Sequence, residues 1–206
     1  MSGSGSLTIE KGDNKDINLA GFKGANVASG SITIDKVNAG DTIKLNKDDG
    51  IKETIKLNSG ASTSDSSAAT ITGLASGDIL NVSGAFSGFS GSSSFESQTS
   101  TFSVSNTSKA YYFNNIENID FTEQNLGQAL LNAISAANSS ISSISVSSTG
   151  KAIFALNSGD GNAYLFSVAG GTSKTNITTA DVKLLAVVDN KIDTNDKISG
   201  GEITFA

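Results

Sequence analysis

The sequence predicts an all-β fold, mainly of antiparallel, sandwich-like strands, with one packed α-helix near residues 123–138. Three observations support this prediction. Short segments alternate apolar and polar residues, as half-buried strands do. One segment past the middle of the chain instead repeats its apolar residues with the helical period. Ser, Thr, Asn and Gly together make up 93 of the 206 residues, and these residue types favour turns over helices.

The N-terminal half contains two internal repeats. Thr-Ile-Lys-Leu-Asn occurs at 42–46 and again at 54–58, and the pattern Ile-x-x-Φ-x-x-Gly-Asp (Φ is apolar) occurs at 34–41 and 71–78. Repeats of this kind indicate stacked or paired β units. With two copies of each, we favour a sandwich over a solenoid, and short stacked β repeats are the alternative arrangement. The strands expected here are 7–9, 17–19, 32–34, 43–45, 55–57 and 79–82.

A Ser/Gly-rich stretch at residues 83–108 has two interpretations. Its composition is typical of a flexible linker. Its four phenylalanines supply apolar bulk that linkers lack, which favours a packed loop and edge strand; they are Phe86, Phe89, Phe95 and Phe102. Composition alone does not decide between the two.

The helix over 123–138 is predicted by one apolar stripe and by its first turn. Thr122 is a suitable N-cap, and Glu123 suits the positive end of the helix dipole. The stripe consists of Leu126, Leu130, Ala133, Ile134 and Ala137.

Strands return after the helix, at 144–146, 152–156, 164–168, 182–188 and 203–205. The segment Asn157–Asn162 is a strong hairpin signal, and residues 169–179 form a Gly/Thr/Asn-rich loop. We therefore divide the chain into a linker at 1–6, a β-rich region with short repeats at 7–105, and a β module with one helix at 106–206.

The amino-acid composition excludes several kinds of site. His, Cys, Pro and Trp are absent, and all basic residues are lysines. Catalysis through His or Cys and metal sites of imidazole or thiolate are therefore impossible, so we expect no enzyme. Carboxylates, amides, hydroxyls and backbone carbonyls remain, which are the ligands calcium prefers. The net charge of −6 argues against nucleic acid as a partner, and no apolar run is long enough for a transmembrane segment.

Two acidic turns are the calcium candidates. Asp189, Asp193, Asn195 and Asp196 lie within eight residues directly after an expected strand, and Asp160 lies in the expected hairpin turn. A short acidic turn can supply several of the six to eight oxygens that calcium needs. The spacing is not that of an EF-hand. The alternative interpretation is that all five residues stabilise solvated turns through local hydrogen bonds.

The C-terminal hundred residues resemble the C-terminal module of bacterial surface-layer proteins and calcium-dependent adhesins exported by type I secretion. The resemblance rests on Ile116-Glu-Asn-Ile-Asp-Phe121 before the helix, then Gly161-Asn-Ala-Tyr-Leu-Phe166, then Asp181-Val-Lys-Leu-Leu-Ala-Val with an acidic tail. It implies a secreted protein at the extracellular cell surface, with calcium as the cofactor and a secretion signal overlapping residues from about 150 onward. The calcium-binding nonapeptide GGxGxDxUx is missing, and the 169–179 loop carries Lys174 and no acid.

This resemblance implies a structural protein, the C-terminal part of a surface-layer subunit that self-associates laterally into a lattice with calcium. Its other expected partners are the type I secretion machinery and cell-surface polysaccharide. The alternative is an adhesin or glycan-binding module that uses Tyr111 and Tyr112. A fragment of a secreted carbohydrate-active enzyme is disfavoured because no local carboxylate pair is present. We expect the 206 residues to be part of a longer chain.

Overall fold

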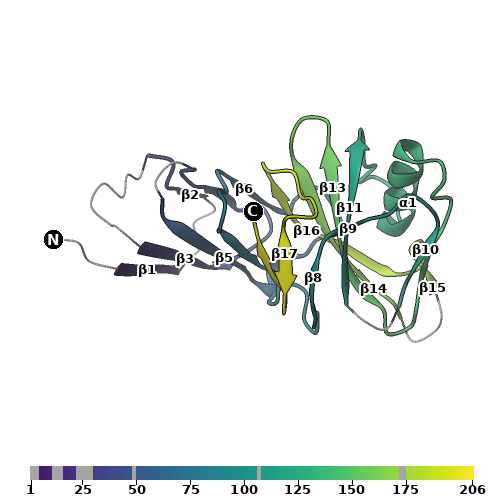
Figure 1. The fold of residues 1–206 in the computed structure, drawn as a ribbon, viewed down its shortest axis with the longest axis horizontal. Helices are drawn as coiled ribbons and strands as arrows, with labels where there is room; N and C mark the ends of the chain where they lie inside the picture. Colours follow the sequence, from purple (N-terminus) through teal and green to yellow (C-terminus); the bar gives the residue numbers. More distant parts are fainter. Residues whose placement is uncertain (1–4, 11–15, 22–29, 48–49, 106–107, 172–174) are drawn as a thin grey trace.

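A computed structural model describes residues 5–10, 16–21, 30–47, 50–105, 108–171 and 175–206. It contains two large sheets, one small sheet and one α-helix (Figure 1). Sheet A has the order β1 (Gly5–Glu10), β3 (Gly30–Val37), β5 (Lys52–Leu57), β7 (Ile79–Asn81), β18 (Glu202–Thr204), β17 (Lys197–Ser199), β8 (Ser92–Ser94). Sheet B has the order β2 (Asp16–Asn18), β4 (Thr42–Lys44), β6 (Ala69–Thr72), β16 (Asp181–Val188), β14 (Ala163–Ala169), β13 (Lys151–Ser158), β11 (Lys109–Ile116), β9 (Glu96–Ser97). The small sheet, sheet C, has the order β10 (Phe102–Val104), β12 (Ile144–Val146), β15 (Thr175–Asn176).

The predicted fold class, mainly β with one helix, is confirmed, but the sheets are mixed rather than mainly antiparallel. From β1 to β7 the chain alternates between sheets A and B, and every strand pairs in parallel with the strand two positions away. Short stacked repeats, the alternative arrangement, are therefore what the N-terminal half contains. Its turns carry the chain across to the opposite sheet, so successive strands in one sheet run in the same direction. We call each pair of successive strands, one in each sheet, a coil: β1 and β2 form the first coil, β3 and β4 the second, and β5 and β6 the third.

The C-terminal half adds antiparallel strands to both sheets. In sheet B, β13, β14 and β16 pair as two antiparallel neighbours, and the predicted hairpin joins β13 to β14. In sheet A, β18 pairs with β7 and β17 in antiparallel fashion. Both large sheets thus combine strands from the first and the second half of the chain.

Two apolar cores lie on opposite faces of sheet B. The first core fills the space between sheets A and B along the whole stack. The second lies between the C-terminal strands of sheet B, sheet C and α1 (Leu126–Ala137). In β13, Ile153 and Ala155 enter the first core, whereas Phe154 and Leu156 enter the second. The uninterrupted apolar run of this strand reflects burial on both faces.

The Ser/Gly-rich stretch packs onto the fold rather than serving as a linker. Phe86, Phe89 and Phe95 are buried in the first core, and Phe102 packs against the second, with its ring tilted against those of Tyr111 and Phe154. Strands β8, β9 and β10 come from this segment. Residues 106–107 lie outside the described residues.

The helix begins three residues later than predicted. Asn125 is the N-cap, and its side-chain oxygen accepts hydrogen bonds from the backbone N–H groups of Gly127 and Gln128. Thr122 instead donates its backbone N–H and its hydroxyl to the Asp120 carboxylate, which stabilises a turn ahead of the helix. Asx-type bonds of this kind compete with helix initiation, and this accounts for the later start.

Candidate functional site

Asp196, the predicted calcium ligand with the most buried side chain, accepts two backbone hydrogen bonds. Its Oδ2 accepts from the N–H of Asp193 at 2.8 Å and its Oδ1 from the N–H of Ala206 at 2.9 Å. The side chain lies where the chain passes from β16 to β17, and the residue is only 4% exposed. Burial raises the pKa of this carboxyl, the Asp193 charge raises it further, and the two N–H donors act in the opposite direction.

The same arrangement occurs at two other crossings between the sheets. Asp41 accepts the N–H of Asn38 at 2.7 Å, and Asp78 accepts the N–H of Ala75 at 2.7 Å; both aspartates are buried. Asp78 also accepts the N–H of Glu53, on the adjacent coil, at 2.9 Å. We call Asp41, Asp78 and Asp196 the corner aspartates. Each satisfies the backbone N–H three residues before it at a point where the chain changes sheet.

The corner has a sequence signature, and the repeat at 34–41 and 71–78 overlaps two of its copies. All three copies read Φ-x-x-[Gly/Asn]-Asp-x-Φ, where Φ is apolar: 37–43, 74–80 and 192–198. In the third copy Asn195 replaces the glycine, and the acidic residues there indicate either a calcium site or a solvated turn rather than a corner. The apolar residue two positions after the aspartate is the signal that identifies it. This apolar residue is a buried residue of the strand that follows the corner in the opposite sheet.

The other predicted calcium ligands lie in three separate surroundings. Asp189 accepts the N–H of Gly73 with both oxygens, at 3.0 and 2.9 Å, and its Oδ2 lies 3.6 Å from the Lys47 ammonium. Asp193 accepts the N–H of Asn195 at 2.7 Å in the turn before Asp196. Asp160 lies on the β13–β14 hairpin and accepts from Asn162, which lowers the pKa of this exposed carboxyl.

The structure therefore brings Asp193, Asn195 and Asp196 into one turn, and each residue takes part in its hydrogen bonds. Among the described residues, no three acidic side chains form a group that could hold a metal ion. Calcium at these turns stays a prediction. Asp193 and Asn195 are the exposed members of the turn.

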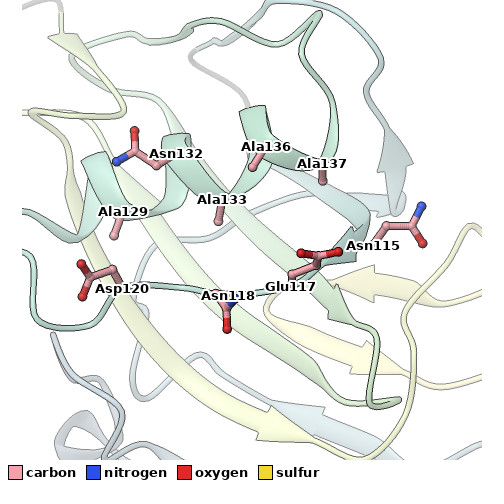
Figure 2. Close-up of a pocket in the computed structure, with 9 residues that line it drawn as sticks. All are labelled: Asn115, Glu117, Asn118, Asp120, Ala129, Asn132, Ala133, Ala136 and Ala137. Atoms are coloured by element: carbon pink, nitrogen blue, oxygen red, sulfur yellow. The ribbon is translucent and has the colours of Figure 1, made fainter.

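A groove beside α1 is the second candidate site, and the sequence analysis did not find it. It has a volume of about 490 Å³ and lies between the helix and the segment that follows β11 (Figure 2). One wall is the small-residue face of the helix, with Ala129, Ala133, Ala136 and Ala137. The other residues are polar: Asn115, Glu117, Asn118, Asp120 and Asn132.

The polar side chains of the groove differ in whether they already make hydrogen bonds within the protein. Asp120 accepts from Thr122, and these bonds lower the pKa of its carboxyl, so it stays ionised. Asn132 bonds Gln128 and Glu123 along the helix. Glu117 and Asn118 are exposed and, within the described part of the chain, make no hydrogen bond or ion pair. Their carboxylate and amide are available to a ligand with hydroxyl or cationic groups.

A β-bulge places Asn115 at the mouth of the groove. The pairing of β11 with β13 shifts register between Phe113 and Ile116, and Asn115 has a φ of 61°. Asn tolerates this left-handed conformation better than most residues. The bulge keeps Ile116 buried and turns the polar residues around it toward solvent.

The two tyrosines expected to stack on glycans do not form a surface platform. Tyr111 is 4% exposed and packs among Phe102 and Phe154, and burial raises the pKa of its hydroxyl to about 12. Tyr112 packs against the first core from the other face of β11. This part of the expectation is wrong, because β11 belongs to the middle layer and its two faces contact different cores.

The fold and these sites define a mixed β protein with stacked coils at one end and a helix-covered sheet at the other (Figure 1). Comparisons of the chain with protein-family models, curated proteins and solved structures found no match. No helix in the described residues is long and apolar enough to span a membrane.

Proposed function

We propose that this chain is a non-catalytic structural module of a secreted cell-surface protein, which associates laterally into a surface-layer lattice with calcium. The observation that supports this function best is the architecture of the coils. Strands β1, β3 and β5 repeat in register, so Thr8, Thr33 and Thr54 lie in one row on the outer face of sheet A. A repetitive, rigid framework with an open end suits a protein whose task is to be joined to others.

Calcium has a restricted place in this proposal. The corner aspartates are buried and already accept backbone N–H hydrogen bonds, so they are the less suitable calcium ligands. Asp193 and Asn195 are exposed beside Asp196, and an ion at this turn would offset the repulsion between Asp193 and Asp196. Binding would favour the folded turn over the unfolded one.

The test is thermal unfolding and negative-stain imaging of the 206-residue chain, with and without millimolar calcium and with magnesium as the comparison ion. Calcium should raise the melting temperature and produce ordered two-dimensional arrays of the protein. Asp193→Asn should remove the calcium response. Asp65→Asn is the matched control, because Asp65 is an exposed turn aspartate that also accepts from the residue two positions later. An equal response in both variants would place calcium elsewhere, and no ordered assembly at any calcium concentration would contradict the function.

The groove favours a second function, recognition of a surface polysaccharide. Carboxylate and amide groups beside a small apolar wall match the hydroxyls and ring carbons of a sugar. A glycan array probed with the wild-type chain should show binding that Asn118→Ala and Glu117→Gln abolish. Neither change removes an internal hydrogen bond, so stability should stay the same. Binding retained in both variants would exclude the groove.

A further inference from the structure

As far as the described residues extend, the first coil (β1 and β2) forms one edge of each large sheet. Among the described strands, β1 is the last of sheet A and β2 the last of sheet B at the N-terminal end. The first coil also buries its apolar residues incompletely: Ile9, Ile17 and Leu19 are partly buried against the first core. Leu7, in β1, is 49% exposed, which makes it the one large apolar side chain classed as exposed in the described chain.

An open edge of this kind is a template for another strand. Its outward N–H and C=O groups can pair with a second chain, and natural proteins block such edges with charges, prolines or bulges. In β1 the only charged residue is Glu10 at its end, and proline is absent from the sequence. The described part of β1 pairs with β3 over six consecutive residues without a register shift.

We propose that β1 is a self-association edge, at which two copies of this chain pair their first coils antiparallel about a two-fold axis through Thr8. This register places Leu7 of one copy opposite Ile9 of the other, twice, and so covers the exposed leucine with an apolar cross-strand partner. Thr8 faces its own equivalent, and Ser6 faces Glu10. The row of Thr54, Thr33 and Thr8 then continues across the axis into the second copy.

The edge strand of sheet B, β2, has a sequence that is self-complementary in the same way. An antiparallel pair of β2 strands centred on Ile17 places Asp16 opposite Asn18 of the other copy, so no two carboxylates face each other directly. A two-fold interface must be complementary to itself, and both edge strands meet this condition. This complementarity is the reason to choose a second copy over an unrelated partner. The contact rests on the proposed function to the extent that it would be one contact of the lattice.

Cysteine substitution tests the register directly, because the natural sequence has no cysteine. Thr8→Cys places the new thiol at the axis, so mild oxidation should give a covalent dimer in high yield. Thr33→Cys is the matched control: it lies on the same outer face, one strand further in, and should stay monomeric. Absence of a Thr8→Cys dimer, or equal cross-linking of both variants, would overturn the proposal.

Sedimentation velocity supplies the second measurement. Two short edge strands bury less area than a stable dimer interface, so the wild-type chain should dimerise weakly and with concentration dependence. Leu7→Lys should weaken the dimer at least tenfold and leave the melting temperature of the monomer almost unchanged, because residue 7 is half exposed. A dimer as strong in Leu7→Lys as in the wild type would overturn the proposal. So would cross-linking of Thr8→Cys to Ser94→Cys, on the outer face of the β8 edge, which indicates head-to-tail stacking.

Imaging of the same variants separates this inference from the proposed function. If Leu7→Lys forms ordered two-dimensional arrays as readily as the wild type, the β1 contact is contradicted and the surface-layer function is not. A Thr8→Cys dimer in a chain that never forms such arrays would support the contact and contradict the function.

Discussion

The two ends of sheet B differ in how many of their faces are covered, and their sequences differ accordingly. Strand β4 contacts a core on one face only, and Thr42, Ile43 and Lys44 alternate between partly exposed and buried positions. Strand β13 contacts a core on both faces, and six consecutive residues from Ala152 to Asn157 are buried. The comparison teaches that one sheet can change from a two-layer to a three-layer structure along its length, and that the polar content of each strand records where this happens.

The largest expected effect tests this comparison in the three-layer part. Phe154→Ala removes a fully buried ring that contacts Tyr111 and Phe113 in the second core. We expect a loss of about 4 kcal/mol in the free energy of unfolding, measured by urea denaturation. Thr70→Ala, on the outer face of the two-layer part, should cost less than about 1 kcal/mol. Equal losses would mean that the two ends of the sheet are covered alike.

The second prediction contrasts a corner with a hairpin. Asp78→Ala leaves the buried N–H of Glu53 and the partly buried N–H of Ala75 without their acceptor, which should cost about 3 kcal/mol. Asp160→Ala removes an exposed carboxylate of the β13–β14 hairpin, whose N–H partner can bond to water instead, so the loss should be much smaller than at Asp78. Urea denaturation of both variants measures the difference. A loss at Asp160 as large as at Asp78 would contradict the role assigned to the corner.

The third corner aspartate, Asp196, and the hairpin aspartate, Asp160, should respond to pH with opposite signs. The pKa of Asp196 is raised in the folded state above its ordinary value of 3.8. The unfolded chain therefore releases this proton first, and stability falls as the pH rises from 3.8 through the folded pKa. The pKa of Asp160 is lowered, so its contribution is present above pH 3.8 and is lost as the pH falls below that value.

The measurement is the urea midpoint of the wild type minus that of Asp196→Asn, from acid to neutral pH. This difference should decline as the pH rises. Asp193→Asn should make the decline smaller, since the Asp193 charge contributes to the shift. A difference that is constant or increases with pH would show that burial does not dominate at this corner.

The smallest effect compares the two bulges, one in each half of the chain. Lys36 in β3 and Asn115 in β11 both have a φ of 61°, and each pairing shifts register there. Lys36→Gly should stabilise the fold by about 0.5–1 kcal/mol, because lysine is strained in this conformation. Asn115→Gly should gain less, because asparagine adopts it more readily. Thermal denaturation of the two variants tests the order, and a loss at Lys36→Gly would contradict it.

Strand positions could be predicted from the sequence, but their partners could not. The alternation that marks Ile32 and Ile34, or Ile55 and Leu57, depends only on local burial. Whether the next strand joins the same sheet or the opposite one depends on the turn. Asp41 and Asp160 both follow an apolar-x-x-Gly pattern, yet one is in a corner and the other in a hairpin. The residue two positions after Asp41 is the apolar Ile43, whereas the residue two positions after Asp160 is the polar Asn162.

The candidate sites were predictable to a smaller extent. The turn at 189–196 was found from its acidic residues, but the hydrogen bonds that occupy Asp196 come from Asp193 and from Ala206, ten residues away. The groove combines residues 115–120 with one face of α1, and no sequence spacing reports that contact. The bulges had a local signal: the apolar spacing changes from two to three residues at Ile34–Val37 and at Phe113–Ile116.

The pairing of β7 with β18 has a consequence for the order in which the chain can fold. Asn81 bonds Glu202, 121 positions away, and β18 is the strand that joins the parallel coils to β17 and β8. Contacts of such long sequence separation close slowly, because the loop entropy is lost before they form. During synthesis, which begins at the N-terminus, the coils can stack early. The two parts of sheet A stay separate until residues 202–204 have been made and β18 can pair with β7 and β17. Strand β18 therefore sets the time at which sheet A becomes continuous.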